Sequence, residues 1–142
     1  MTDASFEKLD PSEQPLYGPR RLVLCGFDTA ARADFEKLMK VAEVGGLDCH
    51  WAGDSDGELL LKTLFEAPLG PPGVPAGDHP RTIVAGGLLQ KELHLLMNLS
   101  REVGMPPTLW AVLTPTSAKW PLKALLKELN AERAARKRQP PK

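Results

Sequence analysis

The sequence is poor in cysteine, in long apolar runs and in net charge. Its 142 residues include two cysteines, Cys25 and Cys49, which are too few for a disulfide framework. No apolar run approaches the roughly 20 residues of a membrane helix, and residues 1–20 lack the pattern of a signal peptide. Lys plus Arg and Asp plus Glu both total 18, without the basic excess typical of nucleic-acid binding. These absences predict a cytoplasmic protein with free thiols, and argue against a membrane or nucleic-acid partner.

Motifs for well-known chemistries are missing as well. The sequence has no Gly-Lys-Ser/Thr loop for phosphates, and Gly86-Gly87 lacks the third glycine of a dinucleotide loop. It has no CxxC pair, and its three histidines, His50, His79 and His94, are widely separated. A closed zinc site of four ligands is therefore not expected. We predict no cofactor, no metal and no catalytic residue, and favour a non-enzymatic binding or regulatory module. The alternative is a small enzyme or a thiol- or metal-dependent protein.

Short apolar segments and amphipathic stripes alternate along the chain. Strands are predicted near residues 22–25, 47–51, 82–85 and 109–113, each followed by a helical stripe. The segment 109–113 is apolar throughout, which predicts an interior strand covered on both faces. Because a strand joined to the next by a helix normally lies parallel to it, we expect an α/β fold. It would contain two βαβα repeats, forming a four-stranded, mostly parallel sheet with four helices.

Composition divides the chain into five segments of one compact domain. Residues 66–80 contain five prolines and three glycines, which predicts a partly extended linker without a packed element. The predicted segments are an irregular leader (1–20), a first repeat (21–67), the linker (68–80), a second repeat (81–130) and a basic tail (131–142). The tail is interpreted as a solvated end, with an arm for nucleic acid or an acidic partner as the alternative.

Identities between the halves support an internal repeat. One set lies at an offset of 59 residues: Glu43-Val44-Gly45 with Glu102-Val103-Gly104, and Trp51-Ala52 with Trp110-Ala111. Another lies at an offset of 61: Gly26 with Gly87, Leu61 with Leu122, and Leu64 with Leu125. We interpret them as a duplication with two short length changes. A fused pair of repeats would already bury its sheet, so a monomer or a weak homodimer is expected.

The second half carries a recognisable pattern. Gly86-Gly87-Leu88 opens it, Ala111-Val112-Leu113-Thr114-Pro115 follows a helix, and Trp120 precedes a leucine-rich stripe. Over about residues 81–130, this sequence pattern resembles that of the small bacterial proteins of domain-of-unknown-function family 3783. The first half departs from the pattern, with Gly53-Asp54-Ser55-Asp56 in place of the Thr-Pro turn. The resemblance implies a bacterial, cytoplasmic origin and brings no settled activity or catalytic residues.

The turns after the strands are the candidate ligand site. In a parallel sheet, ligands bind beyond the carboxyl ends of the strands, where helix N-termini favour anions. The candidate residues are Gly26, Asp54, Ser55, Asp56, Gly87, Thr114 and Thr116. We expect the four turns to meet at one edge and to hold a small anionic ligand, or an unknown protein partner. The alternative is that glycine and small polar residues are simply what such turns require.

Two features of the first half suggest more specific chemical activities. Asp54-Ser55-Asp56-Gly57 is similar to the nucleophile loop of haloacid-dehalogenase-type phosphatases, or could hold a hard cation. Glu58 replaces the usual threonine, however, and helix capping explains the carboxylates. Cys25, at a strand end before a helix, could be a reactive thiol. A Cys-His pair with His50 or a two-thiol switch with Cys49 is also conceivable, although burial of both cysteines in the core is the simpler interpretation.

Overall fold

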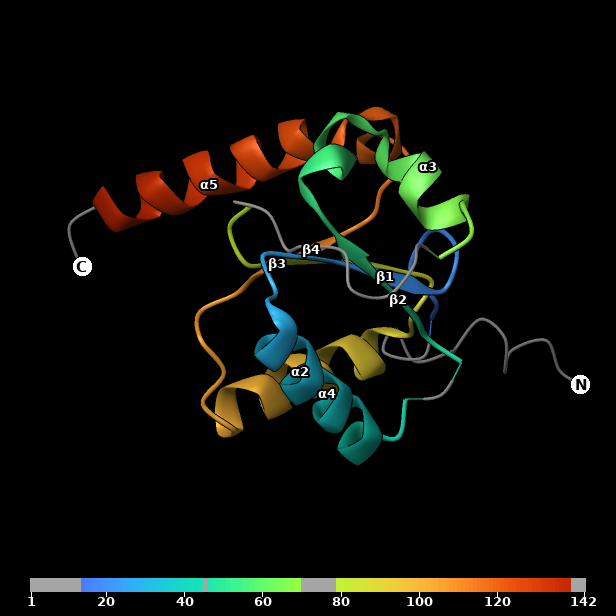
Figure 1. Ribbon diagram of the computed structural model, residues 1–142, viewed down its shortest axis with the longest axis vertical. Helices are drawn as coiled ribbons and strands as arrows, with labels where there is room; N and C mark the ends of the chain where they lie inside the picture. The colour runs from blue at the N-terminus through green and yellow to red at the C-terminus, as the bar shows by residue number, and fades with distance from the viewer. Residues whose placement is uncertain (1–13, 45, 70–78, 139–142) are drawn as a thin grey trace, which may run out of the picture.

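Four strands form one mixed sheet in the computed structural model, which describes residues 14–44, 46–69 and 79–138 (Figure 1). The strand order is β2-β1-β3-β4. The strands are β1 (Arg21–Cys25), β2 (Asp48–Ala52), β3 (Thr82–Gly86) and β4 (Leu109–Val112). β1 is parallel to β2 and β3 is parallel to β4, whereas β1 and β3 are antiparallel. The expected α/β fold with a mostly parallel sheet is confirmed, and its centre is antiparallel.

Helices cover both faces of the sheet (Figure 1). α2 (Thr29–Ala42) and α4 (Gln90–Glu102) pack on one face. α3 (Leu61–Glu66), α5 (Leu122–Arg138) and the short 3-10 helices η2 (Asp54–Glu58) and η3 (Ser117–Lys119) lie on the other. Each face has its own hydrophobic core. Because both faces are covered, all residues of β1 and β3 are buried.

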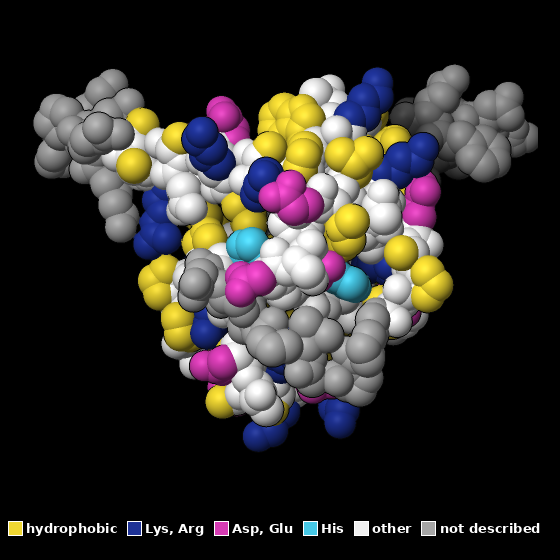
Figure 2. Space-filling view, turned by 45° about the horizontal axis from the view of Figure 1, so that its top comes forward, with side chains coloured by type: hydrophobic (Ala, Val, Ile, Leu, Met, Phe, Trp, Pro, Cys, Tyr) yellow, Lys and Arg dark blue, Asp and Glu magenta, His cyan; other side chains and the backbone are white. Residues whose placement is uncertain are grey.

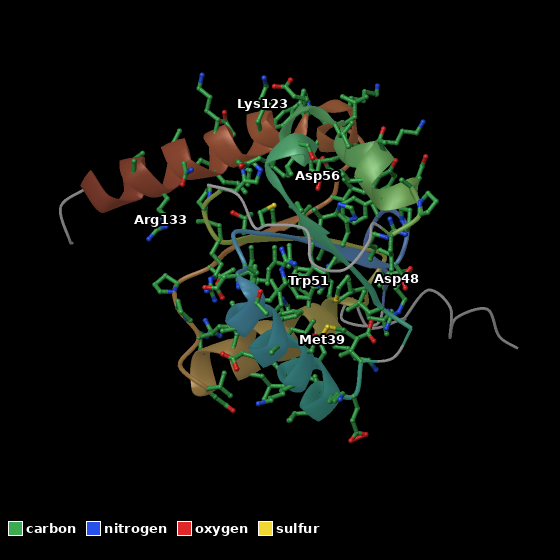
Figure 3. The ribbon with its side chains drawn as sticks, viewed as in Figure 1. Met39, Asp48, Trp51, Asp56, Lys123 and Arg133 are labelled. Carbon is green, nitrogen blue, oxygen red and sulfur yellow. The ribbon has the colours of Figure 1, made fainter. Side chains whose placement is uncertain are left out.

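Alternation along the strands assigns side chains to the two cores. Leu22 and Leu24 belong to the core under α2 and α4, while Val23 and Cys25 belong to the core under α3 and α5. Trp51 of β2 lies on the α2 side (Figure 3), where its ring centroid is 6.3 Å from that of Phe35. These aromatic contacts pack α2 against the sheet.

Local sequence explains where α2 begins and ends. The carboxylate of Asp28 accepts a hydrogen bond from the Ala31 amide at 2.8 Å and so caps the first turn of the helix. Glu43 ends the helix in the left-handed conformation, with φ 56°. α4 has a different start, since Glu92 reaches back to accept from the Leu89 amide at 2.9 Å. The two equivalent helices are thus capped by different residues.

The prediction that residues 109–113 form an interior strand is wrong. β4 lies at the sheet edge, and among the described strands it pairs with β3 alone. Trp110 is partly buried against the core under α2 and α4, and Val112 is 38% exposed. The interior positions belong to β1 and β3, because the halves join through their first strands rather than their last.

One helix crosses a predicted segment boundary. α5 continues past residue 130, where the second repeat was expected to end, and reaches Arg138. Alanine, glutamate, arginine and lysine are strong helix formers, so this basic segment extends the helix (Figure 1). In the predicted leader, residues 14–20 are described, and the Leu16 amide donates to the Leu88 carbonyl at 2.7 Å. Residues 1–13, 70–78 and 139–142 of the predicted leader, linker and tail lie outside the described residues.

The halves correspond at a constant spacing of 61 residues. The paired first residues are Arg21 and Thr82 of β1 and β3, Thr29 and Gln90 of α2 and α4, Asp48 and Leu109 of β2 and β4, and Leu61 and Leu122 of α3 and α5. Hydrogen bonds between the halves show the same spacing. The Leu61 amide donates to the Trp120 carbonyl and the Leu122 amide donates to the Leu59 carbonyl, both at 2.9 Å. The two expected length changes are therefore wrong, and the identities at offset 59 are not structurally equivalent. Duplication itself stays a prediction.

Candidate functional site

The antiparallel centre of the sheet separates the predicted site into two. The carboxyl ends of β1 and β2 lie at one edge of the sheet, whereas the carboxyl ends of β3 and β4 lie at the opposite edge. The first edge carries Gly26, Asp54, Ser55 and Asp56, and the second carries Gly87, Thr114 and Thr116. The expectation that the four turns meet at one edge is therefore wrong. The rule that ligands bind beyond the carboxyl ends of parallel strands holds only within each half, because only there are the strands parallel.

At the first edge, the acidic turn forms η2. Asp56 Oδ2 accepts from the Gly53 amide at 2.9 Å and lies 3.3 Å from His50 Nε2. Asp56 lies on the α3 and α5 side of the sheet (Figure 3). Within the described ranges, no group of three His, Cys, Asp or Glu residues could hold a metal ion. The Asp56 carboxylate thus closes the turn and contacts β2.

Reciprocal hydrogen bonds close the turn at the second edge. Thr114 Oγ1 accepts from the Ser117 amide at 2.9 Å, and Ser117 Oγ accepts from the Thr114 amide at 3.0 Å. Thr116 is exposed and its side chain makes no capping bond to η3. The polar groups of Thr114 therefore fix the turn before η3.

The two cysteines lie on opposite faces of the sheet. Cys25 belongs to the core under α3 and α5, whereas Cys49 packs on the α2 side, with its Sγ 3.4 Å from Met39 Sδ. Burial raises the pKa of both thiols to about 12, with smaller contributions from nearby carboxylates. The reactive thiol and the two-thiol switch are both disfavoured, because a thiolate is the reactive species and the sheet separates the two sulfurs.

We expect both thiols to resist alkylation in the native protein. Raising a thiol pKa from 9.0 to about 12 lowers the thiolate fraction at pH 8 about a thousandfold. Incubation with iodoacetamide at pH 8, read by intact mass, should leave both cysteines unmodified. The same reaction in concentrated guanidinium chloride is the control and should modify both. Rapid native labelling of Cys25 would contradict the burial described above.

The strongest candidate site is a cleft between α2 on one side and the end of α4 with the segment that links it to β4 on the other, called the α2–α4 cleft. Its volume is about 540 Å³. Apolar side chains line much of it: Leu38, Val41, Leu99, Val103, Met105 and Pro106. Four charged residues also line it: Asp28, Asp34, Lys37 and Arg81. None of these residues was predicted as a site residue from the sequence, because the cleft depends on how α2 and α4 pack on one face.

Arg81 is the residue that gives this cleft a specific polar feature. Its guanidinium carbon lies 4.7 Å from the centroid of the Phe27 ring, a cation–π distance. Phe27 is buried, so the ring provides a fixed platform for the cation. The ion pairs among the described residues do not include Arg81. Arg81 therefore lines the cleft without forming an ion pair to a carboxylate in the described part of the chain.

The second half of the chain is similar to one protein family. Residues 81–135 match DUF3783, a domain of unknown function. This agrees with the resemblance found over about residues 81–130. No curated protein and no solved structure matches the chain significantly. The DUF3783 segment supplies Arg81 and the α4 side of the cleft, whereas α2 supplies the other side from outside this segment.

Other surfaces give weaker signals. None of the described helices is both long and apolar enough to cross a bilayer. Acidic and basic side chains are intermixed on the face shown in Figure 2, with two histidines near its centre. Mixed charge does not create the single-sign field that attracts nucleic acid. The α2–α4 cleft therefore remains the best-defined candidate site.

Proposed function

We propose that this protein is a non-enzymatic binding module that holds a small amphipathic ligand in the α2–α4 cleft. The observation that carries the proposal is the cleft itself, with a volume of about 540 Å³ and a lining that combines apolar and charged residues. Small-molecule sites are typically clefts of about 300–1,000 Å³ with mainly apolar walls and a few polar groups. The cleft matches both criteria.

Exposed valines at the cleft support binding of an apolar group. Val41 is 72% exposed and Val103 is 67% exposed, although both line the cleft. Covering such a side chain removes apolar surface from water and favours association by up to about 1.5–3 kcal/mol when burial is complete. A ligand with an apolar body would gain this contribution from both walls.

The chemistry of the turns favours a binding module over an enzyme. Burial disfavours the thiolates of Cys25 and Cys49. Asp56 and Thr114 already make the hydrogen bonds that hold their turns. These observations favour the binding module over the alternative of a thiol- or carboxylate-based enzyme.

Two exposed alanines on α2 allow a matched test with 8-anilinonaphthalene-1-sulfonate as an amphipathic probe. Ala30 lines the cleft, whereas Ala33 does not. We expect saturable binding to the native protein, and a Kd at least about tenfold higher for Ala30→Trp, since the new ring fills part of the cleft. Ala33→Trp should retain the original Kd. Fluorescence titration measures binding, and circular dichroism checks that each variant is folded.

Two results would contradict the proposal. The first is that the folded protein does not bind the probe. The second is that Ala30→Trp and Ala33→Trp bind it equally well, which would place the probe elsewhere on the surface.

A further inference from the structure

Two arginines occupy equivalent positions in the two halves. Pro19-Arg20 precedes β1 and Pro80-Arg81 precedes β3, at the same spacing of 61 residues that relates the elements. Each dipeptide passes close to a glycine of the opposite half. A Cβ on Gly87 would lie 2.5 Å from the Arg20 nitrogen, and one on Gly26 would lie 2.9 Å from the Arg81 nitrogen. The backbone around the two arginines is therefore arranged alike.

One member of this arginine pair has an internal partner. The two terminal nitrogens of Arg20 donate to the two carboxylate oxygens of Glu92 at 2.7 and 2.8 Å. This bidentate geometry is the strong form of an arginine–carboxylate pair. The hydrogen bond from Arg20 lowers the pKa of Glu92, and the same bond raises the pKa of Arg20. The position is thus built for a guanidinium holding a carboxylate at the start of α4.

The other member lacks that partner. The residue equivalent to Glu92 is Ala31, in the first turn of α2 and lining the cleft. Alanine has no group to offer Arg81. The Asp28 carboxylate caps α2 by accepting from the Ala31 amide at 2.8 Å. It does not replace the glutamate, since the ion pairs among the described residues include no pair between Asp28 and Arg81. One of two equivalent arginine sites is therefore filled by the chain, and the other opens into the cleft.

We propose that the ligand of this cleft is a small amphipathic carboxylate, and that Arg81 holds its carboxylate as Arg20 holds Glu92. The inference rests on the proposed function and adds the chemical class of the ligand. The Phe27 ring keeps the guanidinium in place, and its planar fork matches a carboxylate. Leu38, Val41 and Leu99 offer apolar contacts for the rest of the ligand. Asp34 and Lys37 lie one turn apart on α2, so their opposite charges offset each other along the cleft.

Titrations with octanoate and 1-octanol, followed by amide chemical shifts, test the carboxylate separately from the cleft. Octanoate should bind the native protein more tightly than 1-octanol does. Arg81→Gln should raise the Kd for octanoate about tenfold to a hundredfold, the range expected when hydrogen bonds to a charged group are lost. The Kd for 1-octanol should stay unchanged. Lys40→Gln is the matched control, because it removes one positive charge from α2 outside the cleft lining. It should change octanoate binding less than about threefold.

A second variant supplies the missing carboxylate within the chain. Ala31→Glu places a glutamate where the other half has Glu92, so it should pair with Arg81 and weaken octanoate as much as Arg81→Gln does. Circular dichroism identifies any variant that fails to fold, and Arg81→Gln then decides alone.

The outcomes separate the inference from the proposed function. If octanoate and 1-octanol bind equally well in the cleft and Arg81→Gln changes neither affinity, the proposed carboxylate ligand is overturned and the proposed binding module stands. Binding of neither compound to the folded protein overturns the carboxylate ligand, while the anilinonaphthalene titration judges the cleft independently. A dimer in sedimentation velocity that Val41→Asp dissociates would assign the cleft to a second copy of the chain, and would overturn both.

Discussion

Replacing Phe35 with alanine is expected to lower the free energy of unfolding by about 4 kcal/mol. Phe35 is fully buried, on the face of α2 that packs against the sheet. Its ring centroid lies 5.9 Å from that of Phe27 and 6.3 Å from that of Trp51, both with edge-on geometry. Truncation removes these contacts and leaves a cavity that the rigid sheet does not fill. Since small proteins are stable by only about 5–15 kcal/mol, much of the stability would be lost.

Urea denaturation followed by circular dichroism measures this effect. Trp51 fluorescence is unsuitable as the only probe, because the substitution changes the surroundings of that ring directly. Lys40→Ala is the control, an exposed position on the same helix that should change stability by less than about 0.5 kcal/mol. Similar denaturation midpoints for Phe35→Ala and Lys40→Ala would show that α2 does not depend on the aromatic cluster.

Replacing Gly87 with alanine is expected to lower stability by about 4 kcal/mol, from two separate causes. The residue has φ +72°, a conformation that is about 1–2 kcal/mol less favourable for an L-amino acid. Its new Cβ would also lie 2.5 Å from both the Cα and the nitrogen of Arg20. These are backbone atoms of the opposite half, and overpacking of this kind adds about 1–3 kcal/mol. The halves would have to separate locally to accept the methyl group.

Gly104 provides the matched control for the steric part. It has φ +76°, nearly the same as Gly87, but a Cβ there would meet nothing within 4 Å. Gly104→Ala should therefore show only the conformational part, about 1–2 kcal/mol. Thermal unfolding of both variants in one buffer gives the comparison. Equal losses for the two substitutions would mean that the close approach to Arg20 contributes nothing.

The elements of this fold could be predicted from sequence more readily than their directions. Apolar runs indicated the strands, and amphipathic stripes indicated the helices that follow them. The crossover rule fixes the direction of strands joined by a helix, so it applied within each half. It did not apply between halves, where the Pro- and Gly-rich segment 66–80 carries no signal for parallel or antiparallel pairing. Residues 109–113 were predicted as an interior strand because they are apolar throughout, whereas the interior positions of the sheet belong to β1 and β3.

The candidate site was harder to predict, for a related reason. A cleft between α2 and α4 exists only because both helices pack on the same face of the sheet. One available signal was overlooked. The dipeptides Pro19-Arg20 and Pro80-Arg81 recur at an offset of 61, and at this offset Glu92 corresponds to Ala31. That comparison would have shown one arginine with an acidic counterpart and one without, although not the cleft into which the second opens.

The arrangement of the central strands has a consequence for how such a site can arise. The arginine that precedes the first strand of each half lies near the first helix of the other half, as Arg20 does with Glu92 of α4. In a symmetric dimer of identical single repeats, every substitution appears twice, so both arginine sites would be filled or both would be open. Joining two repeats in one chain removes this constraint. One site can then keep its internal carboxylate and its contribution to stability, while the other is free to take its carboxylate from solution.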